Sequence, residues 1–236
     1  MVFGGIQKVT LLDYPDKTAC TLFTIGCNFR CPFCQNSSLV EPEKSGDAAG
    51  EAQRIKASEI IDFLKKRQGL LEGVCISGGE PLLQDGLYDF IKDVKGMGFL
   101  VKLDTNGGEP EKLKEIITSG TIDYIAMDIK NTPEKYAETI GVPEYDASKI
   151  KESVNILLSS EVQYEFRTTV VRELHCTEDI LNIAKWISAA DRYFLQGFIN
   201  FDGVMQKGLS GYSNEEMQEL LRNVKKIQPA AELRGV

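Results

Sequence analysis

The sequence predicts an α/β fold, a partial (β/α)6 barrel of the TIM type built by residues 1–236 as a single domain. Six short apolar runs alternate with longer segments of helical period, which is typical of parallel βαβ units. Polar or glycine-containing motifs follow the first four runs, as expected where parallel strands share one carboxyl-terminal rim. Single-domain barrels also occupy roughly this chain length. The same alternation fits a doubly wound sheet, and the four motifs favour the barrel.

The predicted strands are rich in β-branched and aromatic residues and cover 19–25, 73–77, 99–103, 124–127, 164–170 and 193–199. Ser58 is expected to cap the first of the helices between them, and the others cover 83–97, 111–119, 146–160, 178–190 and 214–227. Residues 41–54, rich in Glu, Gly and Ala, predict a surface loop. The expected domain core spans about 18–201, and 214–227 is a C-terminal helix.

Composition excludes several classes of partner. Against 27 Lys and Arg stand 35 Asp and Glu, and the net charge of −8 disfavours nucleic acid and anionic membrane surfaces. Asp13, Asp16 and Lys17 interrupt the first thirty residues, so no signal peptide is expected. No apolar run is long enough for a membrane span, and the reducing cytoplasm is the expected compartment.

Three cysteines follow the first predicted strand. Cys27, Cys31 and Cys34 are spaced by four and then three residues, so one short loop can turn three thiolates toward one centre. Soft thiolates select iron–sulfur clusters, zinc or copper(I). Structural zinc normally takes four closed ligands, and the remaining cysteines are dispersed. The spacing therefore favours a four-iron cluster with one iron left open, and zinc is the alternative.

The next two strands also end in motifs. Gly78, Gly79, Glu80 and Pro81 follow the second strand, where glycines allow the backbone close to a ligand and a carboxylate can hold an ammonium group. An ordinary turn is the simpler interpretation of the glycine pair. Asp104 and Thr105 end the third strand, and we expect them to offer oxygen atoms to a cofactor.

Charged side chains stand at the fourth and fifth strands. Asp128 and Lys130 are two residues apart, so on a strand they share one face, although a surface ion pair would have the same spacing. Arg167 lies within an apolar strand, where burial is costly unless the charge is paired. This cost favours a position facing a site.

The cysteine motif resembles that of the radical S-adenosylmethionine (radical SAM) enzymes, with Phe33 at the aromatic position before the third cysteine. The resemblance implies that Cys27, Cys31 and Cys34 hold one [4Fe-4S] cluster and that SAM chelates the open iron. Reductive cleavage of SAM would give a 5′-deoxyadenosyl radical, with no catalytic residue beyond the cluster and SAM. The same resemblance implies that residues 78–81 bind the methionine ammonium group of SAM.

The Asp-Thr-Asn-Gly and Met-Asp-Ile-Lys stretches resemble the branch that activates glycyl radical enzymes. This resemblance implies that Asp104, Thr105, Asp128 and Lys130 contact SAM or a monovalent cation near its carboxylate. It implies that Arg167 approaches the ribose or carboxylate of SAM. Pyruvate formate-lyase activases carry a histidine at the sixth strand, whereas this chain offers Gln196 or Asn200 as a replacement polar contact. His175 belongs to another strand end and is expected on the surface or in a loop.

Residues 5–17 and 20–26 closely resemble the anaerobic ribonucleoside-triphosphate reductase-activating proteins. The resemblance implies a glycyl radical enzyme as partner, anaerobic ribonucleotide reductase first, and an external flavodoxin or ferredoxin as electron donor. The three remaining cysteines are too dispersed to hold a second cluster, so one cluster is expected. The alternatives are another glycyl radical enzyme such as pyruvate formate-lyase, a small-molecule substrate, and a zinc-bearing scaffold.

Overall fold

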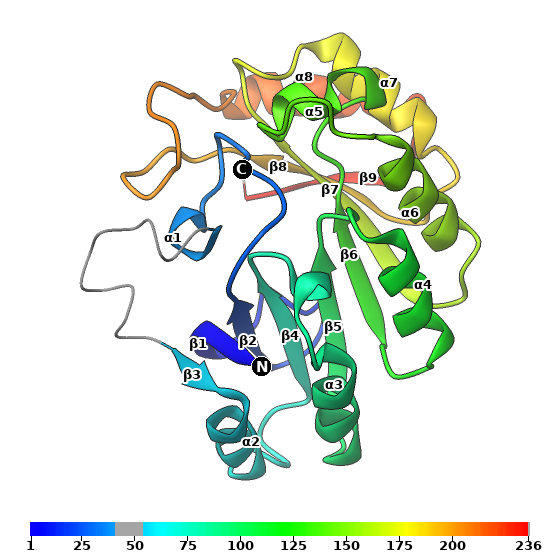
Figure 1. Cartoon of the computed structure of the whole chain (residues 1–236). Coiled ribbons are helices and arrows are strands. Elements are labelled where there is room, and N and C mark those ends of the chain that lie inside the picture. The colour runs from blue at the N-terminus through cyan, green and yellow to red at the C-terminus, as the bar shows by residue number, and fades with distance from the viewer. Residues whose placement is uncertain (41–53, 236) are drawn as a thin grey trace. The chain divides into compact units, whose positions relative to one another are not determined.

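The computed structural model describes residues 1–40 and 54–235 and has an α/β architecture (Figure 1). Nine strands lie in this part of the chain: β1 (Val2–Thr10), β2 (Ala19–Thr24), β3 (Ile55–Lys56), β4 (Gly73–Gly78), β5 (Leu100–Thr105), β6 (Tyr124–Asp128), β7 (Gln163–Val170), β8 (Tyr193–Gly197) and β9 (Ala231–Arg234). The α-helices are α1 (Ser37–Val40), α2 (Ala57–Lys65), α3 (Leu87–Gly96), α4 (Pro110–Thr118), α5 (Tyr136–Thr139), α6 (Ser148–Leu158), α7 (Thr177–Trp186) and α8 (Asn214–Val224). Two short 3₁₀ helices cover Pro81–Leu83 and Pro133–Lys135.

The strands are hydrogen-bonded in the order β3-β1-β2-β4-β5-β6-β7-β8-β9, so the sheet is open and has end strands. Pairing is parallel from β2 through β4 to β5 and from β7 through β8 to β9. Only β1 adds antiparallel pairing, to β2 on one side and to β3 on the other, among the pairs described. The predicted α/β fold with an unclosed sheet is confirmed.

The chain forms two compact units. The first comprises residues 1–28, 38–105 and 111–125, and the second comprises 29–37, 106–110 and 126–236, of which residues 41–53 and 236 are not described. Strand β6 begins in the first unit and ends in the second. The expectation that 1–236 acts as one domain, with its core over about 18–201, stays a prediction.

Each unit has its own apolar interior. In the first, Leu22, Ile76 and Leu103 of neighbouring parallel strands are fully buried, and α3 packs against β5. In the second, Phe166 and Leu195 are fully buried. Strands with such apolar residues at successive positions are covered on both faces.

The six predicted strands correspond to β2, β4, β5, β6, β7 and β8, with ends within two residues. The helix predicted over 83–97 begins later, because the short helix at Pro81–Leu83 precedes α3. The C-terminal helix ends at Val224 rather than Ile227. Strands β1, β3 and β9 were not predicted.

Ser58 does not cap α2, because the helix already begins at Ala57. The Glu59 carboxylate accepts the Lys56 backbone N–H at 3.1 Å and satisfies the helix end instead. Apart from Arg54, the predicted loop over 41–54 lies outside the described residues. In the described part of the chain, no helix is long and apolar enough to span a membrane.

Candidate functional site

The Gly-Gly-Glu-Pro motif lies against the end of β2 in the first unit. The Gly79 N–H donates to the Thr24 carbonyl at 2.9 Å, and the Glu80 N–H donates to the Gly26 carbonyl at 2.8 Å. A Cβ on Gly79 would lie 2.0 Å from the Gly26 oxygen. Gly78 has a φ of +111°, a conformation that side chains disfavour. Both glycines are therefore required by the backbone itself.

Glu80 joins this motif to the end of β5. Its carboxylate Oε1 accepts the Thr105 hydroxyl at 2.7 Å and the Leu82 N–H at 3.1 Å. Glu80 and Thr105 are both buried. Pro81 is also buried and begins the short helix that follows. The structure thus brings together two motifs that are 25 residues apart in the chain.

Asp104 forms an ion pair with Lys102, a residue that sequence reasoning missed. The Lys102 side chain is 1% exposed and that of Asp104 is 13% exposed. Lys102 Nζ also lies 3.9 Å from Cys75 Sγ and 5.9 Å from the centroid of the Tyr124 ring. A lysine within the apolar run 99–103 is as costly as the arginine in β7. This cost could have identified Lys102 from the sequence as a residue that needs a partner.

In the second unit, an aromatic cluster anchors the segment that carries Cys31 and Cys34. The Phe29 ring packs edge-on against Tyr145 and Tyr136, with centroids 5.1 and 6.3 Å away. The Arg30 N–H donates to the Ile140 carbonyl at 2.8 Å. These contacts fix the chain directly before Cys31.

The loop after β8 also holds the same segment through hydrogen bonds. The Gln206 N–H donates to the Pro32 carbonyl at 2.9 Å. The Ser37 hydroxyl donates to the Gly203 carbonyl at 2.6 Å, and the Gln35 amide donates to the Ile199 carbonyl at 3.2 Å. These three bonds hold the cysteine segment along its length.

Asp128 at the end of β6 pairs with two cations. Arg167 Nε lies 2.8 Å from Asp128 Oδ1, and Lys130 Nζ lies 3.0 Å from Oδ2. Burial raises the pKa of Asp128, but the charges of Arg167 and Lys130 outweigh it and hold the pKa well below its usual range. The Asp128 side chain is 27% exposed. Arg167 is paired, as its predicted position in a strand requires.

Lys130 also touches the cysteine segment, because its Nζ lies 5.7 Å from the centroid of the buried Phe33 ring. Burial lowers the pKa of Lys130, but the charges of Asp128 and Cys31 raise it more, so the ammonium form is favoured. The structure therefore brings Asp128, Lys130 and Arg167 together with Phe33 in one unit.

His175 lies in the loop between β7 and α7, as expected of a lone histidine, but its side chain is buried there rather than on the surface. Its Nδ1 lies 3.1 Å from the Val171 N–H and its Nε2 lies 2.7 Å from the Lys130 carbonyl oxygen. These partners assign the proton to Nε2, with Nδ1 as acceptor. Desolvation by burial lowers the pKa of His175. The imidazole thus supports the backbone that carries Lys130.

None of the six cysteines forms a disulfide bond. Cys27 belongs to the first unit, whereas Cys31 and Cys34 belong to the second. Burial raises the pKa of Cys34, opposed by the Asn36 backbone hydrogen bond and by the charge of Lys130. Within residues 1–40 and 54–235, no group of three or more His, Cys, Asp or Glu residues is arranged to hold a metal ion.

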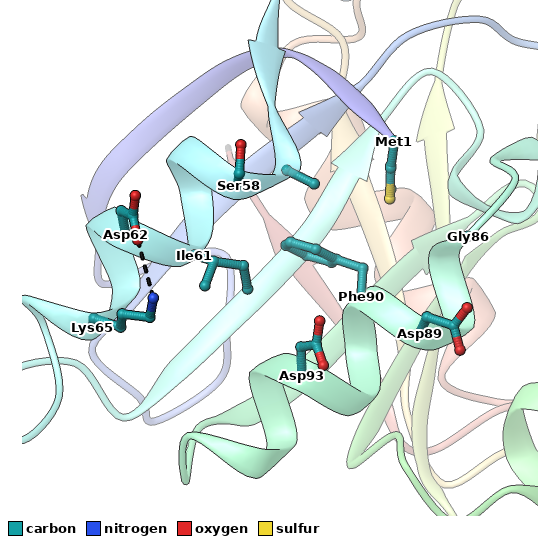
Figure 2. Close-up of a pocket in the computed structure, with 10 residues that line it drawn as sticks. Met1, Ser58, Ile61, Asp62, Lys65, Gly86, Asp89, Phe90 and Asp93 are labelled. Carbon is teal, nitrogen blue, oxygen red and sulfur yellow. Dashed lines mark hydrogen bonds and ion pairs between the residues drawn. The ribbon is translucent and has the colours of Figure 1, made fainter.

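A surface pocket in the first unit lies between α2 and α3 (Figure 2). Asp62, Asp89 and Asp93 line it together with Phe90. Asp62 is paired with Lys65 at 3.1 Å. The pocket contains none of the predicted site residues.

Comparison with known proteins matches residues 21–191 to the Radical SAM superfamily. A protein of Methanocaldococcus jannaschii named as a glycyl-radical enzyme activating enzyme is 35% identical over 94% of this chain and 91% of its own length. A pyruvate formate-lyase-activating enzyme of Listeria monocytogenes is 33% identical over 57% of both chains.

Solved structures show the same fold. SuiB of Streptococcus suis superposes with a TM-score of 0.71 at 14% identity, covering 91% of this chain and 48% of SuiB. The chain therefore spans about half the length of that neighbour. The structure described as anSMEcpe with bound AdoMet has a TM-score of 0.60 at 17% identity, covering 86% of this chain and 57% of its own.

Proposed function

The chain belongs to the radical SAM superfamily and to its glycyl radical enzyme-activating family, and from this membership we propose that Cys27, Cys31 and Cys34 bind one [4Fe-4S] cluster. The single observation that carries the proposal is the spacing of three cysteines in one short segment, none of which forms a disulfide. Thiolates are the ligands that such clusters take, and three of them leave one iron for SAM. The donor set fits the group.

When bound, the reduced cluster would supply the electron that breaks the C5′–S bond of SAM and releases a 5′-deoxyadenosyl radical. The chain's own residues would bind and orient SAM. We assign the methionine ammonium to the motif at 78–81, where Gly79 allows the close approach to the Gly26 carbonyl and Glu80 is a buried carboxylate held by Thr105. A fixed, desolvated carboxylate binds an ammonium group more strongly than a mobile one.

The remaining SAM contacts are proposed in the second unit. Arg167 and Lys130 outnumber the single carboxylate of Asp128, so this group carries a net positive charge. Such a group suits the carboxylate or the ribose hydroxyls of SAM. Phe33, packed beside Lys130, would hold the cysteine segment in place at the edge of the proposed SAM site.

A monovalent cation fits the residues less well. The carboxylates proposed for it, Asp104 and Asp128, already form ion pairs with side-chain cations. No cation is therefore included in the proposed site.

We propose a glycyl radical enzyme as the substrate, with anaerobic ribonucleotide reductase as the first choice, and flavodoxin or ferredoxin as the electron donor. The relative from M. jannaschii supports the class of partner through its name. The stretch at 5–17 supports the choice of the reductase through its resemblance to reductase activators.

The test is anaerobic reconstitution with iron and sulfide, followed by reduction with SAM in the presence of anaerobic ribonucleotide reductase. We expect 5′-deoxyadenosine and a glycyl radical doublet in the EPR spectrum. The same assay is run with pyruvate formate-lyase and with GTP as alternative substrates. GTP is included because a relative from Clostridium perfringens at 24% identity is named GTP 3′,8-cyclase. Retained SAM cleavage in Cys31→Ser would contradict the cluster assignment, and a doublet only with pyruvate formate-lyase would contradict the partner.

A further inference from the structure

Two carboxylates of the proposed site carry their own side-chain cations. Asp104 forms an ion pair with Lys102 in the first unit. Asp128 pairs with Lys130 at 3.0 Å and with Arg167 at 2.8 Å in the second. Neither carboxylate therefore presents an uncompensated negative charge to a metal ion.

The Lys102 pair is built into the interior of the first unit. Lys102 lies on β5 opposite Cys75 of β4 in the parallel register, and its side chain is 1% exposed. The ring of Tyr124, also buried, lies 5.9 Å from the ammonium. Water therefore has almost no access to this charge. A buried ammonium group is costly unless it is paired, so the contact with Asp104 is a permanent feature of the folded unit.

We propose that the Lys102 ammonium is the built-in counter-cation of Asp104, so that SAM binds to this protein without a monovalent metal ion. The inference rests on the proposed function. A cation brought to Asp104 would be attracted by the carboxylate and repelled by the ammonium beside it, and the two effects nearly cancel. Lys102 is thus a positioning residue: it fixes the charge and orientation of Asp104 and does not itself touch the reacting atoms.

The first test uses the wild-type protein with its cluster reconstituted. SAM affinity is measured by calorimetry in potassium, sodium and choline chloride at one ionic strength of about 0.1 M, which keeps general screening constant. We expect the three dissociation constants to agree within about twofold. A loss of about tenfold or more in choline would overturn the proposal.

The second test removes the ammonium. Lys102→Met keeps the length of the side chain and leaves Asp104 without this charge. We expect the variant to bind SAM about tenfold more tightly in potassium than in choline. Its melting temperature without a cluster should also rise with potassium, a readout that is independent of the loaded enzyme. If neither quantity depends on potassium, Lys102 does not replace a cation.

Lys95→Met is the matched control, because Lys95 pairs with Asp123 at 2.7 Å in the same unit but is 27% exposed and outside the proposed site. It should show no cation dependence. If Lys102→Met fails to fold, the wild-type measurement still decides the proposal. Failure of the proposed function would be seen separately, as an absence of cluster absorbance or of 5′-deoxyadenosine in every salt.

Discussion

At the scale of single residues, the position of a charge decides what its loss would cost. Arg167 is 13% exposed and pairs with a carboxylate that is 27% exposed, whereas Arg172 and Glu216 are 43% and 42% exposed. Water and salt compensate an exposed pair but not a largely buried one. The two arginines therefore form a matched comparison within one unit.

We predict that Arg167→Met lowers the free energy of unfolding by about 2 kcal/mol, because it leaves Asp128 with Lys130 alone. Arg172→Met should cost less than about 1 kcal/mol. Urea unfolding followed by circular dichroism measures both. Equal losses would show that burial of the Asp128 pair does not decide its energy.

His175 gives the chain a pH dependence that can be assigned to one side chain, because it is the single histidine. Its folded pKa is lowered by burial, so between that value and the unfolded pKa of about 6.5 the unfolded state binds more protons. The contribution of neutral His175 to the free energy of unfolding is therefore complete above about pH 6.5. It is lost as the pH is lowered through this window. Asp179 and Lys135 face the ring but titrate outside the window.

We predict that the free energy of unfolding of the wild-type protein falls by up to about 1.4 kcal/mol per pH unit below pH 6.5, and that His175→Gln loses this slope. Glutamine retains one donor and one acceptor but does not titrate. Urea unfolding at pH 7.5 and pH 5.5 measures the slope. An unchanged slope in the variant would assign it to other groups.

The same physical rule applies to one residue that was singled out and to one that was missed. The cost of burying a charge identified Arg167 in an apolar strand, and Lys102 stands in an equally apolar run. His175 lies in a loop as expected, but its burial could not be predicted because it depends on the Lys130 carbonyl, 45 residues away in the chain. Local sequence reports which side chains need partners, but not where those partners lie.

At the scale of elements, strands such as β2 and β4 were predictable because their residues are apolar at successive positions, as strands covered on both faces must be. β1 escaped because most of its residues are half-buried or exposed and it includes two glycines. β9 has only four residues and is held in the sheet by its parallel pairing with β8. Both are specified by a neighbouring strand rather than by their own pattern.

The glycine motif after β4 gives the prediction at this scale. Gly79→Ala would place a methyl group 2.0 Å from the Gly26 carbonyl oxygen, so the motif must move away from the end of β2. We expect SAM affinity, measured by calorimetry, to fall at least about tenfold while the cluster absorbance is retained. Gly96→Ala is the control, because a Cβ there meets nothing within 4 Å at the end of α3. That change should leave affinity unaltered and add up to about 1 kcal/mol of stability. Unchanged affinity in Gly79→Ala would remove the motif from the site.

At the scale of the whole molecule, each of the two units has an apolar interior that is independent of the cysteines proposed as ligands. Leu22 and Ile76 are fully buried in the first, as are Phe166 and Leu195 in the second. In small zinc domains, by contrast, metal binding supplies the folding energy, and chelation unfolds them. The effect of metal removal on folding therefore distinguishes a radical SAM enzyme from a zinc-bearing scaffold.

We predict that oxidation and chelation of the reconstituted protein abolish 5′-deoxyadenosine formation but leave the far-ultraviolet circular dichroism and cooperative thermal unfolding in place, because both cores form without the metal. Iron and sulfide should restore activity, and zinc should not, because zinc has no redox chemistry to supply an electron. Cys31→Ser, prepared without metal, is the matched folded control. Loss of the helical signal on chelation, with recovery by zinc alone, would instead assign the three cysteines to a structural zinc site.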